Sequence, residues 1–493
     1  MSYFGIQPFI CGLKLRSIHI FATLTKFRPK YLMTLIKSIS GIRGTIGGKS
    51  GDNLTPLDAV KFASAYGTWL KSRHSGKLKV VIGRDARPSG AMIQSLVQNT
   101  LVGLGIDIID LDLSTTPTVE MAVVFEEANG GIILTASHNP VEWNALKLLN
   151  EKGEFLSGDD GKAILDIVEK DDYDFAEVME LGTVTQNTDS LEKHVDAILA
   201  LPYIETDKIK AANLKVAIDA VNSTGGIAIP YLLKRLGVTQ IEELYCEPNG
   251  KFPHNPEPLE AHLGDIMNLV KDKGCDVGVV VDPDVDRLAL ISEDGKMFGE
   301  EYTLVACADY LLPRKPGAVV SNLSSSRALR DLAARHGSEY FASAVGEVNV
   351  VTKMKEQNAV LGGEGNGGVI LPDLHYGRDS LVGVALILSL LATSGKKMSE
   401  LRASYPEYYM AKNKIQLEAG MDVDGLLKEV EAKYASEQLS TIDGVKIDFE
   451  NEWVHLRKSN TEPIVRVYTE AISPAKATEL GEKFVDEMSS MAK

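Results

Sequence analysis

The chain has 493 residues, 44% of them hydrophobic and 24% charged, which is enough for three or four globular domains. Its 52 basic and 68 acidic residues give a formal charge of −16, which excludes a broad basic surface for nucleic acid. Four scattered cysteines without a CxxC pair argue against zinc and thioredoxin-type sites and are typical of a reducing, cytoplasmic location.

Residues 1–32 are basic and apolar, and the first acidic residue of the chain is Asp52. A signal peptide or an amphipathic anchor fits this composition only loosely, because lysines and arginines interrupt every apolar run. No stretch reaches the ~20 apolar residues that a membrane span needs. We interpret 1–32 as an extension from an early start codon, expect Met33 to open the protein, and predict no membrane association.

Three segments follow one plan, in which a β-branched run leads into a loop of small polar residues and then into a helical pattern that ends at a glycine. The segments begin at Lys79, Lys215 and Gly317, and the glycines are Gly105, Gly237 and Gly337. Repeated strand–loop–helix–strand units predict mixed, mostly parallel sheets flanked by helices. Chance similarity among α/β segments is the alternative.

The C-terminal part has a different pattern. Residues 444–471 alternate apolar and polar side chains in three short runs, which predicts an antiparallel meander, and a helical pattern follows from Pro474. The fold class is therefore α/β, with three mixed-sheet α/β domains and a smaller C-terminal α+β domain. We place these domains at 33–188, 189–293, 294–408 and 409–493.

The sequence "TASHNP" places Ser137 and His138 directly after an apolar, strand-like run. The Gly-x-Ser-x-Gly elbow of a serine hydrolase is absent. Neighbouring side chains on an extended chain point apart, so we expect no proton relay between Ser137 and His138. A serine that exchanges a phosphoryl group needs a metal and cations nearby, and Lys147 is a candidate cation or general acid/base. A polar turn closed by Asn139 and Pro140 is the alternative.

The sequence "DPDVDR" carries three alternating aspartates, Asp282, Asp284 and Asp286. An extended backbone would point all three carboxylates to one side, where a divalent cation would relieve their repulsion. Oxygen ligands without histidine or cysteine indicate Mg²⁺. An EF-hand is the rival, but Arg287 stands where its loop needs glycine, and a strand pattern precedes the loop instead of a helix.

Two further loops contain residues suited to binding polar ligands. The glycine-rich "LGGEGNGG" offers Glu364 and Asn366, a pattern that lets backbone and side chain approach hydroxyl groups closely. The turn in "LRKSNTEPIVRV" offers a phosphate cradle or a plain hairpin turn with exposed charges. Its candidates are Arg457, Ser459, Asn460, Thr461 and Arg466. The glycine-flanked Arg43, and Arg84 and Arg87 in "GRDARPSG", are suited to binding an anion or bridging structural carboxylates.

Taken together, these stretches resemble the α-D-phosphohexomutase family. That family carries, in this order, a phosphoserine loop TASHNP, a metal loop DxDxDR, a sugar loop GE-x-x-G and a phosphate loop R-x-S-G-T-E-P. The corresponding stretches here are 135–140, 282–287, 363–368 and 457–463. The resemblance runs from Met33 to the C-terminus. Ala145, Asn366 and Asn460 depart from the usual residues, and asparagine at 460 suits a left-handed turn where the family has glycine.

The resemblance implies a four-domain enzyme around a central cleft that interconverts hexose 6-phosphate and hexose 1-phosphate through a bisphosphorylated sugar. Ser137 would be the phosphoserine, and Mg²⁺ would lie between its phosphate and the three aspartates. Arg43 and Lys147 would assist the transfer, His138 would lie beside the serine, and Arg287 would neutralise charge. Sugar hydroxyls would bind Glu364 and Asn366, and the distal phosphate would bind the 457–466 residues named above.

The substrate depends on Glu347 in "SAVGEVNV". The resemblance to phosphoglucosamine mutases is strongest there, and a carboxylate beside the sugar could pair with the 2-ammonium of glucosamine 6-phosphate. A solvent-exposed acid at a helix start is the alternative. The rivals are a mutase for glucose or mannose phosphates, a metal-dependent phosphatase, and a sugar-phosphate binding protein without catalysis. The sequence predicts no oligomeric state.

Overall fold

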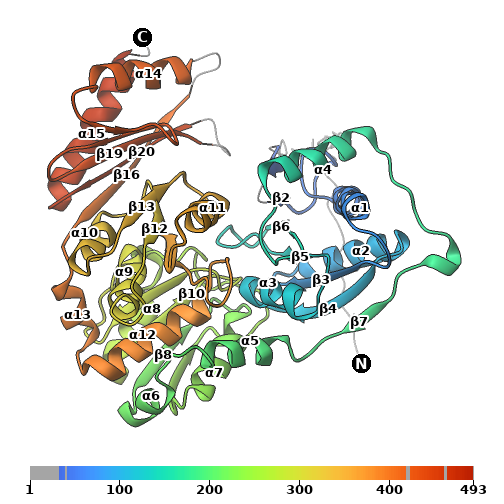
Figure 1. Cartoon of the computed structure of the whole chain (residues 1–493), viewed down its shortest axis with the longest axis horizontal. Coiled ribbons are helices and arrows are strands. Elements are labelled where there is room, and N and C mark those ends of the chain that lie inside the picture. The colour runs from blue at the N-terminus through green and yellow to red at the C-terminus, as the bar shows by residue number, and fades with distance from the viewer. Residues whose placement is uncertain (1–32, 39–40, 418–421, 460–463, 492–493) are drawn as a thin grey trace, which may run out of the picture.

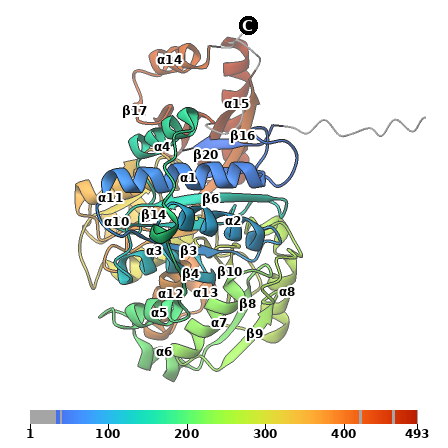
Figure 2. The same ribbon diagram turned by 90° about the vertical axis from the view of Figure 1, so that its right-hand side faces the viewer.

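The computed structural model describes residues 33–38, 41–417, 422–459 and 464–491, which form four sheets in chain order. We name the four domains after these sheets, first to fourth. In Figure 1 the first domain forms one lobe, and the second and third domains lie together in another. The fourth domain extends from the third in Figure 1, and it stands at the top of the molecule in Figure 2.

The first sheet has seven strands in the order β1-β2-β6-β5-β3-β4-β7. Its strands are β1 (Ile36–Ser38), β2 (Gly41–Thr45), β3 (Lys79–Arg84), β4 (Asp107–Leu113), β5 (Gly130–Leu134), β6 (Trp143–Leu149) and β7 (Val184–Gln186). The helices of this part are α1 (Pro56–Arg73), α2 (Gly90–Gly103), α3 (Thr116–Phe125) and α4 (Gly158–Lys170).

The second and third sheets have four strands each, in the orders β11-β10-β8-β9 and β13-β12-β14-β15. The strands are β8 (Lys215–Asp219), β9 (Gln240–Leu244), β10 (Val277–Val281), β11 (Leu288–Ser292), β12 (Val319–Asn322), β13 (Tyr340–Ser343), β14 (Leu361–Glu364) and β15 (Gly368–Ile370). The helices are α5 (Ser190–Leu199), α6 (Thr206–Ala212), α7 (Gly225–Arg235), α8 (Gly264–Lys273), α9 (Glu300–Leu311), α10 (Ala328–Arg335), α11 (Glu347–Gln357), α12 (Ser380–Ser394) and α13 (Met398–Ser404).

These three sheets contain the same four-strand unit. A helix (α2, α7 or α10) joins the first strand of the unit to a second, parallel strand. The third strand lies parallel to the first on its other side, and it forms an antiparallel hairpin with the fourth strand. The predicted repeat is therefore confirmed. The glycines that end its helices, Gly105, Gly237 and Gly337, have φ of 83°, 84° and 67°, which only glycine adopts readily.

The hairpin of each unit, β5–β6, β10–β11 or β14–β15, connects its two strands through one of the motif loops. The connection holds Ser137 in the first domain, the three aspartates in the second, and the glycine loop after Glu364 in the third. Sequence stretches far apart along the chain thus occupy equivalent places in the fold.

The fourth sheet is antiparallel throughout, in the order β16-β20-β19-β18-β17. Its strands are β16 (Tyr409–Gln416), β17 (Gln438–Ser440), β18 (Val445–Asp448), β19 (Trp453–Lys458) and β20 (Ile464–Ala471), with helices α14 (Val423–Lys433) and α15 (Pro474–Met491). The predicted meander corresponds to β18–β20 and the predicted helix to α15. The two edge strands, β16 and β17, were not predicted.

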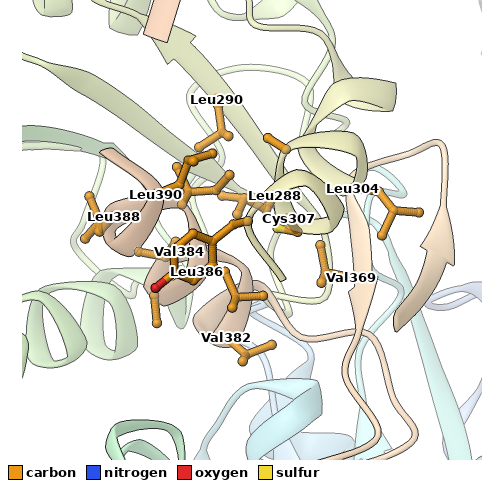
Figure 3. Close-up of a cluster of buried hydrophobic side chains, with 14 of the residues drawn as sticks. Leu288, Leu290, Leu304, Cys307, Val369, Val382, Val384, Leu386, Leu388 and Leu390 are labelled. Atoms are coloured by element: carbon orange, nitrogen blue, oxygen red, sulfur yellow. The ribbon is translucent and has the colours of Figure 1, made fainter. Parts of the chain in front are cut away.

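The largest apolar core joins the second and third domains around α12. Residues 380–391 of this helix are all buried, and Figure 3 shows its side chains against Leu288 and Leu290 of β11 and Leu304 and Cys307 of α9. Asp379 caps the helix by accepting the N–H groups of Leu381 and Val382.

In the described part of the chain no single helix is long and apolar enough to cross a membrane. Only the pair α12 and α13, bent by 91°, has the length and composition of a membrane span when the two helices are taken together.

Candidate active site

Ser137 lies in the β5–β6 connection and is held in an uncommon backbone conformation, with φ of 47°. Its N–H donates to Thr135 Oγ1 at 2.9 Å, and its hydroxyl donates to Asp282 Oδ2 at 2.7 Å. The side chain is buried, with 7% of its surface exposed. The fold therefore holds a strained, buried serine of the first domain against an aspartate of the second.

The side chain of Arg87 holds this loop in place. Its guanidinium donates to the carbonyl groups of Ser137, Asn139, Pro140 and Trp143, and it forms an ion pair with Asp85 at 2.9 Å. Arg87 and Asp85 are both almost completely buried. Of the two alternatives left open for this arginine, the structural one is observed, and Arg84 likewise pairs with Asp112.

We expect Arg87→Met to lower the free energy of unfolding by about 3–5 kcal/mol, because a buried carboxylate loses its partner. Burial already raises the pKa of Asp85, which shows how poorly solvated this carboxylate is. The double variant Asp85→Asn/Arg87→Met should recover part of the loss, since no uncompensated charge remains. Urea unfolding measures both effects, and an unchanged stability of Arg87→Met would contradict this account.

The three aspartates converge, but the expected extended backbone is wrong. Residues 282–287 form a turn between β10 and β11, in which Val285 has φ of 64°. The N–H groups of Asp286 and Arg287 close the turn by donating to Asp282 Oδ1 at 3.2 and 3.1 Å. One oxygen from each carboxylate lies within 4.8 Å of the others, and all three side chains are fully buried. The turn, and not strand alternation, brings them together.

The donor set fits a hard divalent cation. Asp284 Oδ1 and Asp286 Oδ1 are buried and accept no hydrogen bond from the described residues. Burial and the neighbouring carboxylates Asp286 and Asp284 raise the pKa of Asp282 well above its ordinary value, which shows how strongly the three acids repel one another. Oxygen ligands alone, without nitrogen or sulfur, suit Mg²⁺ or Ca²⁺.

Lys147 of β6 brings a cation to the same place. Its Nζ lies 2.6 Å from Asp284 Oδ2 and 3.5 Å from Asp286 Oδ2. Burial opposes its charge, but the two aspartates raise the pKa of Lys147 to about 12. Burial would also raise the pKa of Asp284, yet the ion pair with Lys147 and the hydrogen bonds from Lys147 and Thr116 lower it. Lys147 therefore stays charged at neutral pH.

His138 lies closer to the serine than expected. Because Ser137 is not extended, its Oγ is 3.4 Å from His138 Nδ1, so the argument that adjacent side chains must point apart is wrong here. Burial and the guanidinium of Arg287 lower the pKa of His138 well below its usual value, which leaves the imidazole neutral. Burial and Arg287 also lower the pKa of Arg43, and both arginines act on His138, so they concentrate positive charge near the residue that follows the serine.

The sugar-loop candidates meet at a single arginine, Arg378. Its guanidinium lies 2.8 Å from Asp286, 3.0 Å from Glu347 and 2.9 Å from Glu364. The alternative for Glu347 was a solvent-exposed acid at a helix start. Glu347 is indeed the first residue of α11, but its side chain is buried, with 9% of its surface exposed. Asn366 accepts the N–H of Gly368 at 3.2 Å. Glu347 also lines a cavity of about 130 Å³ between α11 and the segment around Glu154.

The described phosphate-loop candidates, Arg457, Ser459 and Arg466, lie on or next to β19 and β20. Arg457 pairs with Asp443 at 3.1 Å, and Asp443 also accepts the N–H of Val345. The next residue, Gly346, donates its N–H to Glu364 of the sugar loop. Arg466 donates to Tyr468 at 3.1 Å, and Ser459 donates its N–H to Ile464. Asn460 and Thr461 lie outside the described residues. The structure thus connects Arg457 to the site through Asp443 and the 345–346 backbone.

Known proteins match this arrangement over almost the whole chain. A protein of Thermococcus kodakarensis named "Phosphoglucomutase/phosphomannomutase" is 36% identical over 90% of this chain and 98% of its own length. Residues 35–175, 192–295, 299–409 and 412–487 match domains I, II, III and the C-terminal domain of phosphoglucomutase/phosphomannomutase. The chain belongs to the phosphoglucomutase/phosphomannomutase family.

Two further relatives of this family show how widely the match extends. A "Probable phosphoglucosamine mutase" of Methanopyrus kandleri is 32% identical over 91% of this chain and 96% of its own length. The crystal structure of a phosphoglucomutase/phosphomannomutase family protein from Burkholderia thailandensis superimposes with a TM-score of 0.80 at 26% identity, covering 93% of this chain and 98% of that one. The chain is accordingly an isomerase-type phosphotransferase, a phosphohexomutase.

For this family member, sequence reasoning missed Arg378, although it contacts three of the predicted site residues. No local pattern distinguishes an arginine in "LHYGRDSL" from a surface one. A signal was available in the position, because the segment lies between a glycine-rich loop and the N-terminus of an apolar helix. Burial opposes the charge of Arg378, yet Asp286, Glu347 and Glu364 together raise its pKa well above the ordinary value.

Proposed function

We propose that this chain interconverts hexose 6-phosphate and hexose 1-phosphate through a phosphoserine at Ser137 and a bisphosphorylated sugar. The observation that carries the proposal is the 2.7 Å contact between Ser137 Oγ and Asp282 Oδ2. It joins a nucleophile to a carboxylate cluster that fits a cation, which a binding protein without catalysis does not need. A phosphatase would need a placed water molecule instead of the sugar-binding residues of the third domain.

Asp282, Asp284 and Asp286 would hold Mg²⁺ together with phosphorylated Ser137. When bound, the ion would neutralise charge on the transferring phosphoryl group. Arg43 and Arg287 would bind the oxygens of that group. Positioning and electrostatic stabilisation of this kind supply most of the rate of phosphoryl transfer.

The transfer is balanced in protons and phosphoryl groups. The P–Oγ bond at Ser137 breaks, a P–O bond to the free sugar hydroxyl forms, and the hydroxyl proton ends on Ser137 Oγ. Neutral His138 would carry that proton, whereas Lys147 would remain charged and stabilise the oxygens. The bisphosphate then turns round, and the same steps in reverse return its other phosphoryl group to Ser137.

The remaining candidates would hold the sugar while it turns. Glu364 and Asn366 would accept or donate hydrogen bonds to its hydroxyl groups. Arg457, Ser459, Asn460, Thr461 and Arg466 would bind the phosphate that is not transferred, since two guanidinium groups and backbone donors suit a dianion. Binding at two ends keeps the bisphosphate in the cleft between the two transfers.

We further propose glucosamine 6-phosphate as the preferred substrate. Glu347, Glu364 and Asp286 share the single guanidinium of Arg378, and this excess of acidic groups beside the sugar loop favours a cationic amino sugar. Relatives named phosphoglucosamine mutase support this choice. Glucose or mannose phosphate is the second candidate, because both carboxylate oxygens of Glu347 already accept hydrogen bonds from Arg378.

The substrate proposal predicts that kcat/KM is highest for glucosamine 6-phosphate when it is compared with glucose 1-phosphate and mannose 1-phosphate, with Mg²⁺ and a trace of hexose bisphosphate. Glu347→Gln should lower the amino-sugar value roughly 10- to 100-fold, because a charge-assisted hydrogen bond is lost, and should change the others less. Glu154→Gln, in the same cavity but away from Arg378, is the control. Equal losses for all three sugars would favour the second candidate.

A further inference from the structure

A second cluster of metal-type ligands lies buried where the first three domains meet. It contains His194 of α5, and His375 and Asp379 just before α12. Asp379 Oδ2 lies 2.9 Å from His194 Nε2 and 3.3 Å from His375 Nε2. His194 and Asp379 are fully buried, and 9% of the His375 side chain is exposed. The reaction proposed above uses none of these residues.

The distances between these side chains suit the binding of one metal ion by all three residues. Two atoms bound to a tetrahedral zinc ion at about 2.0 Å stand roughly 3.3 Å apart. The two measured Nε2–Oδ2 distances, 2.9 and 3.3 Å, are close to such an edge, and one ligand atom from each residue lies within 4.8 Å of the others. The other oxygen of Asp379 is occupied by the N–H groups of Leu381 and Val382, so Oδ2 alone faces the imidazoles.

Each imidazole has a polar neighbour at its other ring nitrogen, which orients the ring, as is usual for metal-ligating histidines. His194 Nδ1 is 3.0 Å from Thr118 Oγ1, and His375 Nδ1 is 3.3 Å from Glu120 Oε2. Glu120 is 1% exposed, and neither of its oxygens has a hydrogen bond of good geometry within the described residues.

We propose that His194, His375 and Asp379 bind a zinc-class transition-metal ion, in a site distinct from that of the three aspartates. The two imidazoles and the carboxylate of Asp379 would bind the ion directly, and Glu120 would lie behind His375. Nitrogen donors select zinc over Mg²⁺, whereas the oxygen-only cluster selects the reverse. Among the residues that the structure describes, these two groups are the ones that bring three such donors together.

The place of this site indicates a structural role. Its ligands and their partners come from α3 of the first domain, α5 of the second and the start of α12 in the third. Asp379 follows Arg378 directly, so an ion bound here would hold the backbone that presents Arg378 to Asp286, Glu347 and Glu364. The metal would thereby fix the first three domains to one another while the chemistry takes place elsewhere.

The test measures how much zinc each chain retains after loosely bound metal has been removed by chelation and dialysis. Mg²⁺ is kept in large excess to fill the aspartate cluster. We expect one zinc ion per wild-type chain, none in His194→Gln/His375→Gln, and one in Asp282→Asn/Asp284→Asn. No zinc in the wild type would overturn the proposal and would leave a hydrogen-bonded network in which Asp379 and Glu120 outweigh burial and raise the pKa of His375 to about 10. Retention of zinc by the histidine variant would overturn it as well.

X-ray absorption on the zinc-loaded wild type gives an answer that needs no variant to fold. Two imidazole nitrogens at about 2.0–2.1 Å from zinc support the site, and a shell of oxygens alone excludes it. Neither result depends on turnover. Loss of activity in Ser137→Ala, or its absence, therefore tests the proposed function separately.

Discussion

Ser137→Ala is expected to lower kcat by roughly 10⁴-fold or more, because the phosphoryl group loses its only acceptor in the proposed reaction. The change removes one hydroxyl that donates to Asp282 at 2.7 Å, while the arginines and the sugar-loop carboxylates stay in place. Binding of the sugar phosphate, measured by calorimetry, should therefore persist. After treatment with hexose bisphosphate, mass spectrometry should detect one phosphoryl group at Ser137 in the wild type and none in the variant.

The matched control is Ser389→Ala, since Ser389 is also a buried serine but lies on α12, where it donates to Ala385. We expect its kcat to stay within about two-fold of the wild type, because a single buried hydroxyl contributes only about 1 kcal/mol to stability. If Ser137→Ala kept a tenth of the wild-type kcat, the phosphoserine proposal would fail.

Arg378→Met is expected to lower kcat by about 10²–10³-fold and to destabilise the protein by about 3–5 kcal/mol. One guanidinium separates three buried carboxylates, those of Asp286, Glu347 and Glu364, at 2.8–3.0 Å. Without it, the metal loop and the sugar loop lose their common partner. Divalent cations should bind more tightly to the variant, because a positive charge beside Asp286 is gone.

Two companion variants separate stability from catalysis. Arg378→Met/Glu347→Gln removes one of the stranded charges, so it should regain stability in urea unfolding without regaining kcat. Arg378→Lys keeps the charge but has a single nitrogen, which cannot reach three carboxylates at once, so it should remain well below the wild type. Weaker cation binding by Arg378→Met would contradict the proposed arrangement.

Local patterns determined a large part of this protein. The β-branched runs, the small polar loops and the left-handed glycines at 105, 237 and 337 specify three copies of one unit through interactions between near neighbours in the chain. The motifs around Ser137 and Asp282 were likewise visible, because a strand followed by a polar loop places side chains at the end of a sheet. Alternation also predicted the strands β18–β20 of the fourth domain.

The same local reasoning failed where backbone conformation depends on neighbours in space. Ser137 and Val285 have φ of 47° and 64°, so neither loop is extended, and the geometry of Ser137, His138 and the aspartates follows from turns. These turns are held by groups from other parts of the chain, such as Arg87, which donates to the carbonyl of Ser137, and Thr116, which donates to Asp284. Nothing in a run of residues shows which distant hydrogen-bond donors will be available.

The resemblance implied a shared site, but the tertiary structure decided how its residues meet. The sequence patterns placed Ser137, the three aspartates and Glu364 in three separate stretches, and contacts between three domains bring them together, directly or through Arg378. Arg378 and the histidines around Asp379 became visible only then, because their roles depend on burial and on charges from other domains. A single charged residue in a sequence looks the same whether water or three carboxylates surround it, and packing alone makes that difference.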